Sequence, residues 1–289
     1  MLRPAPVEAP AIDHYENFPV ASWLCPPALR PAVAALYHYA RTADDLADEG
    51  SASTEQRLAD LQAYRADVLA LRAGQDLSSP WAATIGALAP HIERHGLDWA
   101  DLLALLDAFV QDVQFSAQAR RYATMDELLH YCARSANPVG HLMLRIMGGA
   151  RGLSEAQARG LSDDICTALQ LINFWQDLSV DVPRGRHYIP RSVWRAHGLP
   201  EDALPAQVGE GRMRAIVRDL VDDALARMQR GQHLARHVPG RMGWELRAVV
   251  QGGRRIAERI AEIDHTSWRQ RPVVRRRDLA RIAWRCWTM

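Results

Sequence analysis

Apolar residues recur along most of this chain at the three- and four-residue spacing of an amphipathic helix. After Thr54, for example, Leu58, Leu61, Val68 and Leu71 fall on one face, as in a helix that packs one side against a core. The pattern predicts helices over 28–49, 54–71, 80–95, 97–115, 124–147 with a kink at its Asn-Pro step, 154–181, 191–197, 211–237, 244–265 and 274–289. Alternating strand patterns and Asn-Gly or Asp-Gly hairpin turns are missing from the sequence, so we expect an all-α protein.

The chain shows no internal repeat and no linker long enough to divide it. At 289 residues and 48% hydrophobic composition, it can bury a large core. We therefore expect one domain over residues 14–289, built as a helical bundle, preceded by a flexible N-terminal arm over residues 1–13.

Charge and composition exclude several classes of function. The 35 basic residues are all arginine and nearly balance 34 acidic residues, so bulk charge does not indicate a nucleic-acid partner. Without lysine, the chain has neither a Schiff-base lysine nor the phosphate-binding lysine of a P-loop. Its four cysteines are far apart, which favours buried apolar roles over redox or metal roles. The N-terminus lacks a signal-peptide core and no 18-residue apolar span occurs, so we expect a cytoplasmic protein and leave a peripheral membrane contact open.

Acidic residues gather at the end of the first expected helix. Four of them, Asp44, Asp45, Asp48 and Glu49, lie within six positions, directly before Gly50. The C-terminal end of a helix carries a partial negative charge, so an acid there costs about 0.3–1 kcal/mol. The like-charged pair Asp44 and Asp48 costs about 0.2–0.5 kcal/mol more. The placement opposes local stability, and a cation between the carboxylates would reverse that effect.

A second stretch, residues 170–186, has the same construction. Asp177 and Asp181 lie four positions apart, and Pro183 and Gly185 end the helix soon afterwards. If the two acidic helix ends face each other across an apolar core, they form one strongly negative site. We expect this site to hold Mg²⁺, which prefers oxygen ligands and combines one or two carboxylates with substrate phosphates.

The two acidic stretches point to a reaction in which a diphosphate leaves. An allylic or cyclopropylcarbinyl diphosphate ionises when metal ions neutralise its leaving group, so that the C–O bond breaks without a nucleophile. The carbocation that remains needs an apolar cavity that excludes water, and aromatic faces attract it. The candidates for such a lining are six aromatic residues: Phe18, Phe109, Tyr131, Phe174, Trp175 and Tyr188.

Three groups of residues together resemble the squalene and phytoene synthase family. They are Leu36-Tyr37…Arg41…Asp44-Asp45-x-x-Asp48, then Arg121-Tyr122…Tyr131-Cys132…Gly140, then Gln170-x-x-Asn173-x-x-x-Asp177-x-x-x-Asp181…Gly185-Arg186-x-Tyr188-x-Pro190. The resemblance in order and spacing covers roughly residues 14–265. The last group with its Gly-Arg-x-Tyr tail is specific, whereas isoprenyl chain-elongating enzymes share the first.

The resemblance implies an all-α, single-domain isoprenoid synthase bundle with a central cavity. It also implies Mg²⁺ as the cofactor, held by the four aspartates of the two acidic stretches and by a neighbouring amide: Asp44, Asp48, Asp177, Asp181 and Asn173. The four aspartates are catalytic on this view, together with Tyr131, which would line the place where a cyclopropyl intermediate rearranges. Besides Asn173, the residues expected to contact the diphosphate or to close over it are Tyr37, Arg41, Gln170, Arg186 and Tyr188.

Two stretches depart from the family pattern. Where relatives usually carry Ser-x-Ser-Phe, residues 16–20 are Glu-Asn-Phe-Pro-Val, and where relatives carry Val-Ala-Gly-x-Val-Gly, residues 135–140 are Ser-Ala-Asn-Pro-Val-Gly. These departures resemble the branch of the family in hopanoid biosynthesis that converts presqualene diphosphate and water into hydroxysqualene and diphosphate without NADPH. Polar Asn17, Ser135 and Asn137 could position that water beside the substrate, although a kink or a helix cap explains Asn17 and Asn137 as well.

Other interpretations stay open. A head-to-head synthase that condenses two farnesyl or geranylgeranyl diphosphates is the enzymatic alternative, and a non-catalytic helical interaction protein on the same scaffold is an alternative from another class. Arg41 could simply pair with Asp44 or Asp45. A partner that makes and hands over presqualene diphosphate is a further expectation. The basic residues 275–287 could form an amphipathic helix that touches anionic membrane, or the charged face of a packed last helix.

Overall fold

The computed structural model describes residues 24–289, so the expected arm over residues 1–13, Asn17 and Phe18 lie outside the described residues. Within this range the secondary structure is helical, without a strand. The α-helices are α1 (Arg30–Asp48), α2 (Thr54–Arg72), α3 (Ala82–His95), α4 (Trp99–Ala117), α5 (Met125–Ser135), α6 (Asn137–Ile146), α7 (Glu155–Gln176), α8 (Leu178–Asp181), α9 (Arg191–Ala196), α10 (Glu210–Gly231), α11 (Leu234–His237), α12 (Gly240–Glu262) and α13 (Arg276–Thr288). Two short 3₁₀ helices, η1 (Val182–Arg184) and η2 (Pro205–Gln207), complete the described chain.

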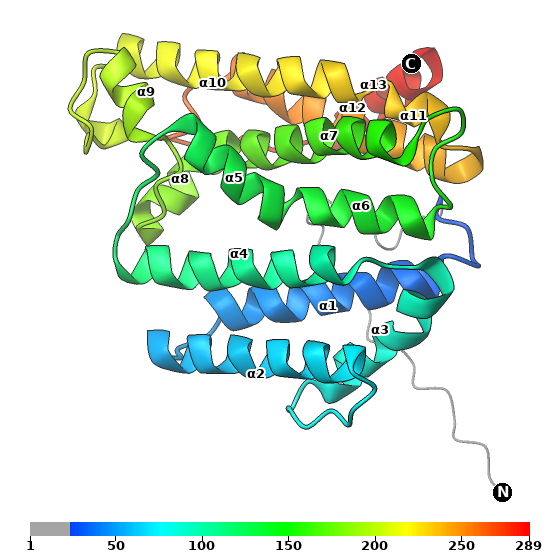
Figure 1. Ribbon diagram of the computed structural model, residues 1–289. Coiled ribbons are helices and arrows are strands. Elements are labelled where there is room, and N and C mark those ends of the chain that lie inside the picture. The colour runs from blue at the N-terminus through cyan, green and yellow to red at the C-terminus, as the bar shows by residue number, and fades with distance from the viewer. Residues whose placement is uncertain (1–23) are drawn as a thin grey trace, which may run out of the picture.

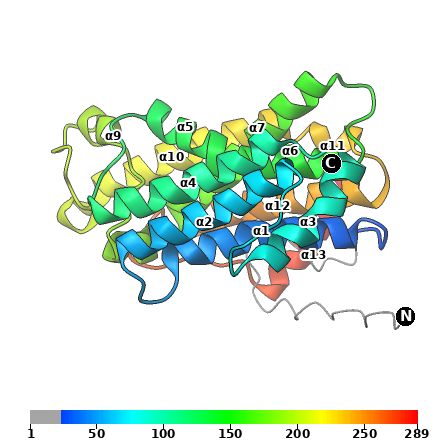
Figure 2. The same ribbon diagram turned by 60° about the horizontal axis from the view of Figure 1, so that its bottom comes forward.

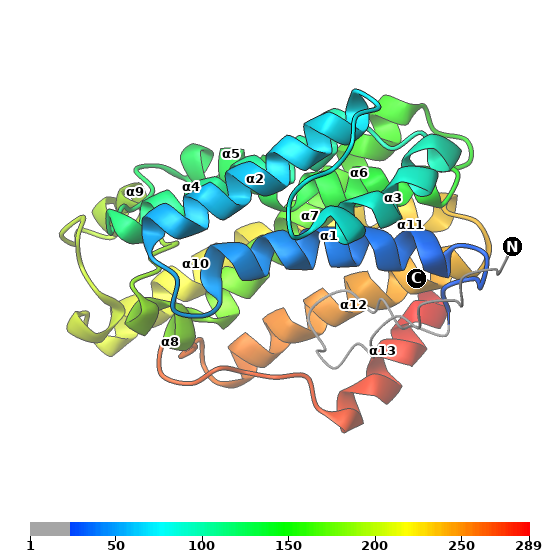
Figure 3. The ribbon, with the colours of Figure 1, turned by 90° about the horizontal axis from the view of Figure 1, so that it is seen from below.

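The long helices form a bundle with α7 near its centre (Figure 1). Helix α7 packs against α5, α6, α10 and α12, while α1 packs against α2, α3 and α4. Seen from below, α1 runs between α2 and α12, and α13 lies at the edge of the molecule beyond α12 (Figures 2 and 3). None of the helices within residues 24–289 is both long and apolar enough to cross a membrane.

Two helices begin at a residue whose side chain caps the first turn. The Ser53 hydroxyl accepts a hydrogen bond from the Gln56 N–H at 3.3 Å, and Thr124 caps α5 by accepting from the Glu127 N–H at 3.2 Å. Each side chain satisfies one backbone donor that the first turn of a helix leaves unpaired. The expected helix over 124–147 is interrupted at Ala136, between α5 and α6, directly before the expected Asn-Pro kink.

Two expected helices are divided in the structure. Helix α7 ends at Gln176 instead of continuing through Asp181, because the Ser179 N–H donates to the Ser267 carbonyl at 3.2 Å in the segment before α13. Asp177 is therefore the cap between α7 and the single turn α8, although the Asp181 N–H still donates to the Asp177 carbonyl at 2.8 Å. The expected helix over 211–237 likewise divides into α10 and α11, and α12 begins at Gly240, four residues earlier than expected.

Buried tyrosines join the first helices to α4. Tyr39 and Tyr64 are fully buried; the Tyr39 hydroxyl donates to the Leu102 carbonyl at 2.9 Å and the Tyr64 hydroxyl to the Tyr39 carbonyl at 3.0 Å. Burial without a partner would cost each hydroxyl several kcal/mol, on the order of 2–7. These two bonds fix α1, α2 and α4 as one unit.

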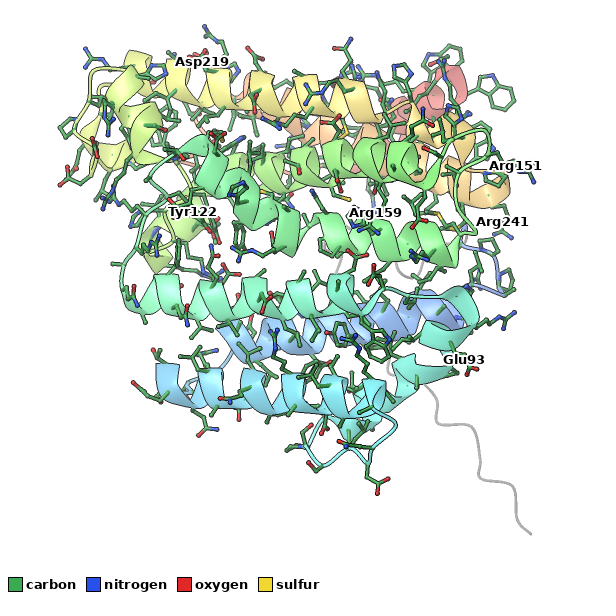
Figure 4. All side chains as sticks on the ribbon, viewed as in Figure 1. Glu93, Tyr122, Arg151, Arg159, Asp219 and Arg241 are labelled. Atoms are coloured by element: carbon green, nitrogen blue, oxygen red, sulfur yellow. The ribbon has the colours of Figure 1, made fainter. Side chains whose placement is uncertain are left out.

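A buried charge cluster joins α4, α6 and α7. His141 lies between the carboxylates of Asp101, at 3.0 Å, and Asp163, at 2.5 Å, and Arg159 also contacts Asp101 at 3.1 Å. Figure 4 labels Arg159 in the middle of the bundle. Burial opposes the charged imidazolium, but the hydrogen bonds to the two carboxylates outweigh it and raise the pKa of His141 to about 9.

Candidate active site

A cavity of about 1060 Å³ opens between α1, α4, α6 and α7, and we call it the mouth cavity. Its polar lining comes from α1, α5 and α7; the residues from α1 and α7 are Tyr37, Arg41, Asp44, Gln170 and Asn173. Apolar side chains of α1, α4, α6 and α7 form most of the remaining lining: Val33, Leu36, Phe109, Val139, Met143 and Leu169. All five polar residues were expected from the sequence, and the structure brings them to one wall of one cavity.

A second cavity, of about 700 Å³, continues deeper into the bundle and is called here the deep cavity. It shares Val33, Met143, Cys166 and Leu169 with the mouth cavity, so the two spaces adjoin. Its far end is formed by α11 and α12 through Leu234, Met242, Glu245, Leu246 and Val249. Together the two cavities give a largely apolar space in which most polar groups lie at the mouth and Glu245 lies at the far end, which suits a ligand with a charged head and a hydrocarbon tail.

Arg186 connects the two acidic helix ends. Its guanidinium donates to the Asp48 carboxylate at 2.8 Å, across 138 positions of sequence. Burial lowers the pKa of Arg186, but the bond to Asp48 and the charge of Asp181 raise it above its usual value. The end of α1 and the turn α8 therefore lie close enough to act on one guanidinium, and Figure 3 shows α8 near that end of α1.

Two more arginines hold the other acids. Arg41 contacts Asp44 at 3.2 Å and Asp45 at 2.7 Å, which is the intrahelical pairing that the sequence left open. Arg271, which follows α12, contacts Asp177 at 2.5 Å. Arg271 could not be found from the sequence, because none of its neighbours along the chain indicates that this segment returns to α8.

Crowding of carboxylates raises pKa values at this end of the bundle. Burial and the charge of Asp177 raise the pKa of Asp181 to about 6. Burial, with smaller contributions from Asp44 and Asp48, raises the pKa of Asp112 to about 7. Asp112 was missed from the sequence, although it continues the apolar face of its helix seven positions after Leu105. An acid on an apolar face is the signal that could have found it.

The Tyr131 hydroxyl donates a hydrogen bond to the Asp112 carboxylate at 2.8 Å. Tyr131 belongs to an aromatic cluster in which Phe174 and Tyr188 stack with ring centroids 3.8 Å apart. Tyr122, labelled in Figure 4 at the α8 end of the bundle, contacts both Tyr131 and Tyr188. Tyr131 is not among the residues that line the mouth cavity, so its expected place in the lining stays a prediction.

The polar residues at the break between α5 and α6 have different surroundings. The Asn137 amide oxygen accepts from the Thr167 hydroxyl at 2.9 Å, and Asn137 is not among the residues that line the mouth cavity. Ser135 does line it, and its hydroxyl oxygen is buried without a hydrogen-bond partner among the described residues. Asn137 therefore has a structural partner, while Ser135 presents an unsatisfied polar atom to the cavity.

The remaining aromatic candidates differ in position. Phe109 lines the mouth cavity. Trp175 is fully buried in the core and is not among the residues that line the mouth cavity or the deep cavity, so its expected place in the lining stays a prediction.

The donors at the mouth are chemically suited to Mg²⁺. They are carboxylates and an amide, the hard oxygen ligands that this ion prefers. Across residues 24–289, no three His, Cys, Asp or Glu side chains converge into a metal centre of their own. Magnesium commonly binds through one or two carboxylates and completes its shell with waters and phosphate oxygens. Burial raises the pKa of Asp181 and the charge of Asp177 raises it further, and a divalent cation would offset both effects.

The helical bundle with its cavity has the all-α isoprenoid synthase fold. The squalene/phytoene synthase family model matches residues 12–278, and the chain belongs to that family. It is 36% identical to the hydroxysqualene synthase of Zymomonas mobilis, over 86% of this chain and 78% of the relative. It is 30% identical to the presqualene diphosphate synthase of the same organism, over 77% and 72%. The crystal structure of squalene synthase HpnC from Alicyclobacillus acidocaldarius is 33% identical, with a TM-score of 0.75 and coverage of 87% and 90%.

Proposed function

We propose that this protein is a hydroxysqualene synthase of hopanoid biosynthesis. It ionises presqualene diphosphate with the help of Mg²⁺, rearranges the carbocation and captures water, releasing hydroxysqualene and diphosphate without NADPH. The observation that carries the proposal is the pair of adjoining, largely apolar cavities, of which the mouth cavity gathers Tyr37, Arg41, Asp44, Gln170 and Asn173. Its similarity to a protein named hydroxysqualene synthase supports the particular reaction.

The polar end of the cavity binds the diphosphate in this proposal. Arg41 and Arg186 donate charge-assisted hydrogen bonds to phosphate oxygens, and Tyr37, Gln170 and Asn173 add neutral ones. When bound to Asp44, Asp48, Asp177 and Asp181, Mg²⁺ supplies the positive charge that stabilises the departing diphosphate.

The apolar interior controls what happens to the carbocation. Val33, Leu36 and Met143 keep bulk water away from the isoprenoid chains. The faces of Tyr131, Phe174 and Tyr188 lie beside the acidic end and offer cation–π stabilisation of ~0.5–2 kcal/mol per contact. The Ser135 hydroxyl holds the single water that attacks, since Ser135 lines the cavity and its hydroxyl oxygen is buried without a partner among the described residues.

The test is a product analysis with three diphosphate substrates. Presqualene diphosphate with Mg²⁺ and without NADPH should give hydroxysqualene, whereas farnesyl or geranylgeranyl diphosphate alone should not be consumed. Addition of a chelator should stop the reaction. Squalene or phytoene as the product, or no turnover of presqualene diphosphate, would overturn the proposal.

A head-to-head prenyltransferase is the second candidate function. The 30% identity to a protein named presqualene diphosphate synthase favours it, since such an enzyme uses the same kind of cavity for two prenyl diphosphates. Consumption of farnesyl diphosphate with formation of presqualene diphosphate would support this candidate. The partner that hands over presqualene diphosphate is then unnecessary, whereas our main proposal requires one.

A further inference from the structure

The C-terminal helix α13 carries a surface that the proposed reaction does not use. Six large apolar side chains are exposed within residues 24–289, and five of them belong to α12, α13 and the segment between: Trp244, Val273, Leu279, Trp284 and Trp287. Trp284 and Trp287 are 69% and 75% exposed. Soluble monomers seldom leave such side chains together on one surface, so this concentration calls for a partner.

Helical geometry places the two tryptophans in the middle of one face. Trp284, Trp287 and Ala280 point to one side of α13, and the exposed arginines Arg276 and Arg277 flank them. The Trp287 ring lies 5.8 Å from that of Trp244, and the Arg247 guanidinium covers Trp244 at 4.8 Å. We call this surface, made of Trp244, Arg276, Arg277, Trp284 and Trp287, the Trp-Arg face.

The opposite side of α13 is fixed to α12 by buried charges. Asp278 is buried and accepts hydrogen bonds from Arg255 and Arg259, each at 2.8 Å. The backbone N–H of Arg275, together with these two arginines, holds the pKa of the Asp278 carboxyl far below its usual range, against the effect of burial. Glu258 is bound by Arg285. The Trp-Arg face is thus part of a docked helix, and the acids Asp278 and Glu258 between α12 and α13 are paired with arginines.

The composition of the face indicates which partner it fits. Tryptophan combines a large apolar ring with one N–H donor and prefers the boundary between water and hydrocarbon. Arginine can lay its methylene stem on apolar surface while its guanidinium binds phosphate groups. Residues 275–277 are three consecutive arginines that precede or begin α13, whereas Arg281 and Arg285 later in the helix pair with Glu258, so the start of the helix is the positive part. A surface with tryptophans at its centre and arginines around them is complementary to an anionic bilayer.

The position of the face agrees with that partner. Figures 2 and 3 show α13 at the edge of the molecule, where the bundle does not cover its outer side. Figure 4 labels Arg241, near the beginning of α12, at the opposite end of the bundle from Tyr122. Leu246 and Val249 of the same helix α12 line the far end of the deep cavity. The Trp-Arg face therefore adjoins the apolar end of the cavities.

We propose that the Trp-Arg face binds the surface of an anionic phospholipid bilayer and makes this protein a peripheral membrane protein. The tryptophan rings enter the headgroup region, and the arginines bind lipid phosphates. Binding depends on both, because a few exposed rings or a few charges alone give only weak attachment.

The test is cosedimentation of the full chain with lipid vesicles. We expect binding to vesicles of phosphatidylcholine mixed with phosphatidylglycerol, weakening as salt is added, and little binding to phosphatidylcholine alone. Replacing Arg276 and Arg277 by glutamine should weaken binding about 30-fold, from the loss of two charges at the surface. Replacing Trp284 and Trp287 by alanine should weaken it more than about tenfold.

Matched controls keep the test specific. Arg72→Gln with Arg94→Gln removes two exposed arginines from α2 and α3, and Leu69→Ala removes the exposed apolar residue of α2; neither should change vesicle binding. All replaced side chains are exposed, so circular dichroism should show unchanged helicity. No turnover is measured, so the result is independent of the proposed reaction.

Three outcomes would overturn the proposal. The first is no binding to anionic vesicles, which would indicate that another protein or residues 1–23 of the chain cover the face. The second is binding that the variants of the Trp-Arg face do not weaken. The third is a dimer in solution that the Trp284→Ala, Trp287→Ala variant converts to monomer, since the face would then be an interface between two copies.

Discussion

At the scale of single residues, carboxylates and arginines set the chemistry at the mouth of the cavity. Asp48, Asp44 and Asp177 are held by Arg186, Arg41 and Arg271, respectively. The pKa values of Asp112 and Asp181 stay raised, because the arginines do not fully offset the effect of burial. The aspartates that weaken their own helix ends therefore meet compensating charges, from the same helix in the case of Arg41 and from distant parts of the chain in the cases of Arg186 and Arg271.

Ser135 gives the sharpest residue-level prediction on product identity. In Ser135→Ala the attacking water loses the hydroxyl that holds it, so hydroxysqualene should fall several-fold as a share of products, in favour of hydrocarbons formed by proton loss. Consumption of presqualene diphosphate should stay within about threefold, because ionisation does not involve Ser135. Chromatography of extracted products measures both quantities. Ser116→Ala, at an exposed serine of α4, is the control; an unchanged product ratio in Ser135→Ala would contradict the role.

His141 makes stability depend on pH. Its folded pKa of about 9 lies above the usual 6.5, so the buried imidazolium stabilises the fold fully below about pH 6.5 and stops doing so as the pH rises through 9. At pH 6, His141→Gln should lower the free energy of unfolding by about 1.5–3 kcal/mol, and this difference should shrink at pH 10. Urea unfolding at both pH values measures it. The exposed His130→Gln is the control, and a difference that stays constant with pH would refute the imidazolium.

At the scale of elements, some helix ends are set by nearby residues in the sequence and others by long-range contacts. Ser53, Thr124 and the Asn-Pro step could be read from the sequence because caps and prolines act within a few residues. The end of α7 could not, because the bond from Ser179 to Ser267 joins segments 88 positions apart. The sequence therefore predicts a helix end well where nearby residues determine it.

Packing of α10 on α7 rests on a glycine. A Cβ at Gly231 would lie 2.6 Å from the Leu161 carbonyl oxygen, a backbone atom that cannot move aside. Gly231→Ala should therefore destabilise the protein by about 1–3 kcal/mol. Gly160→Ala is the matched control on α7, where nothing lies within 4 Å, and it should be neutral or stabilising by up to about 1 kcal/mol. Thermal unfolding followed at 222 nm compares them; equal melting temperatures would contradict the close approach.

At the scale of the whole molecule, the sequence predicts the two ends of the site better than its centre. The acids, the amides and Arg186 stand in recognisable spacing, so their gathering at one end of one bundle could be anticipated. Arg271 and the bond between Asp112 and Tyr131 could not, since each depends on which helices become neighbours. Cavity volume and the exposure of Trp284 are likewise properties of the assembled bundle.

Ligand binding should stabilise the whole fold. Inorganic pyrophosphate with Mg²⁺ should raise the melting temperature by roughly 5 °C at saturation, because a ligand that binds only the folded state shifts the unfolding equilibrium. Each component alone should have a much smaller effect. Asp177→Asn should lose both this shift and turnover while keeping its helical circular dichroism, whereas Asp222→Asn, at an exposed acid of α10, should keep both. An unaltered shift in Asp177→Asn would move the metal role to other residues.

The three arginine–aspartate pairs at the mouth have a kinetic consequence. Because Arg41, Arg186 and Arg271 already hold carboxylates, an incoming diphosphate must take over their hydrogen bonds by exchange. The arginines therefore do not present an uncompensated positive potential to an approaching anion. The association rate constant of Mg²⁺–pyrophosphate, measured by stopped-flow tryptophan fluorescence, should lie below the diffusion limit and be nearly independent of ionic strength. A steep decrease of this rate constant with salt would contradict the exchange, because it would indicate guanidinium groups that are not paired with carboxylates.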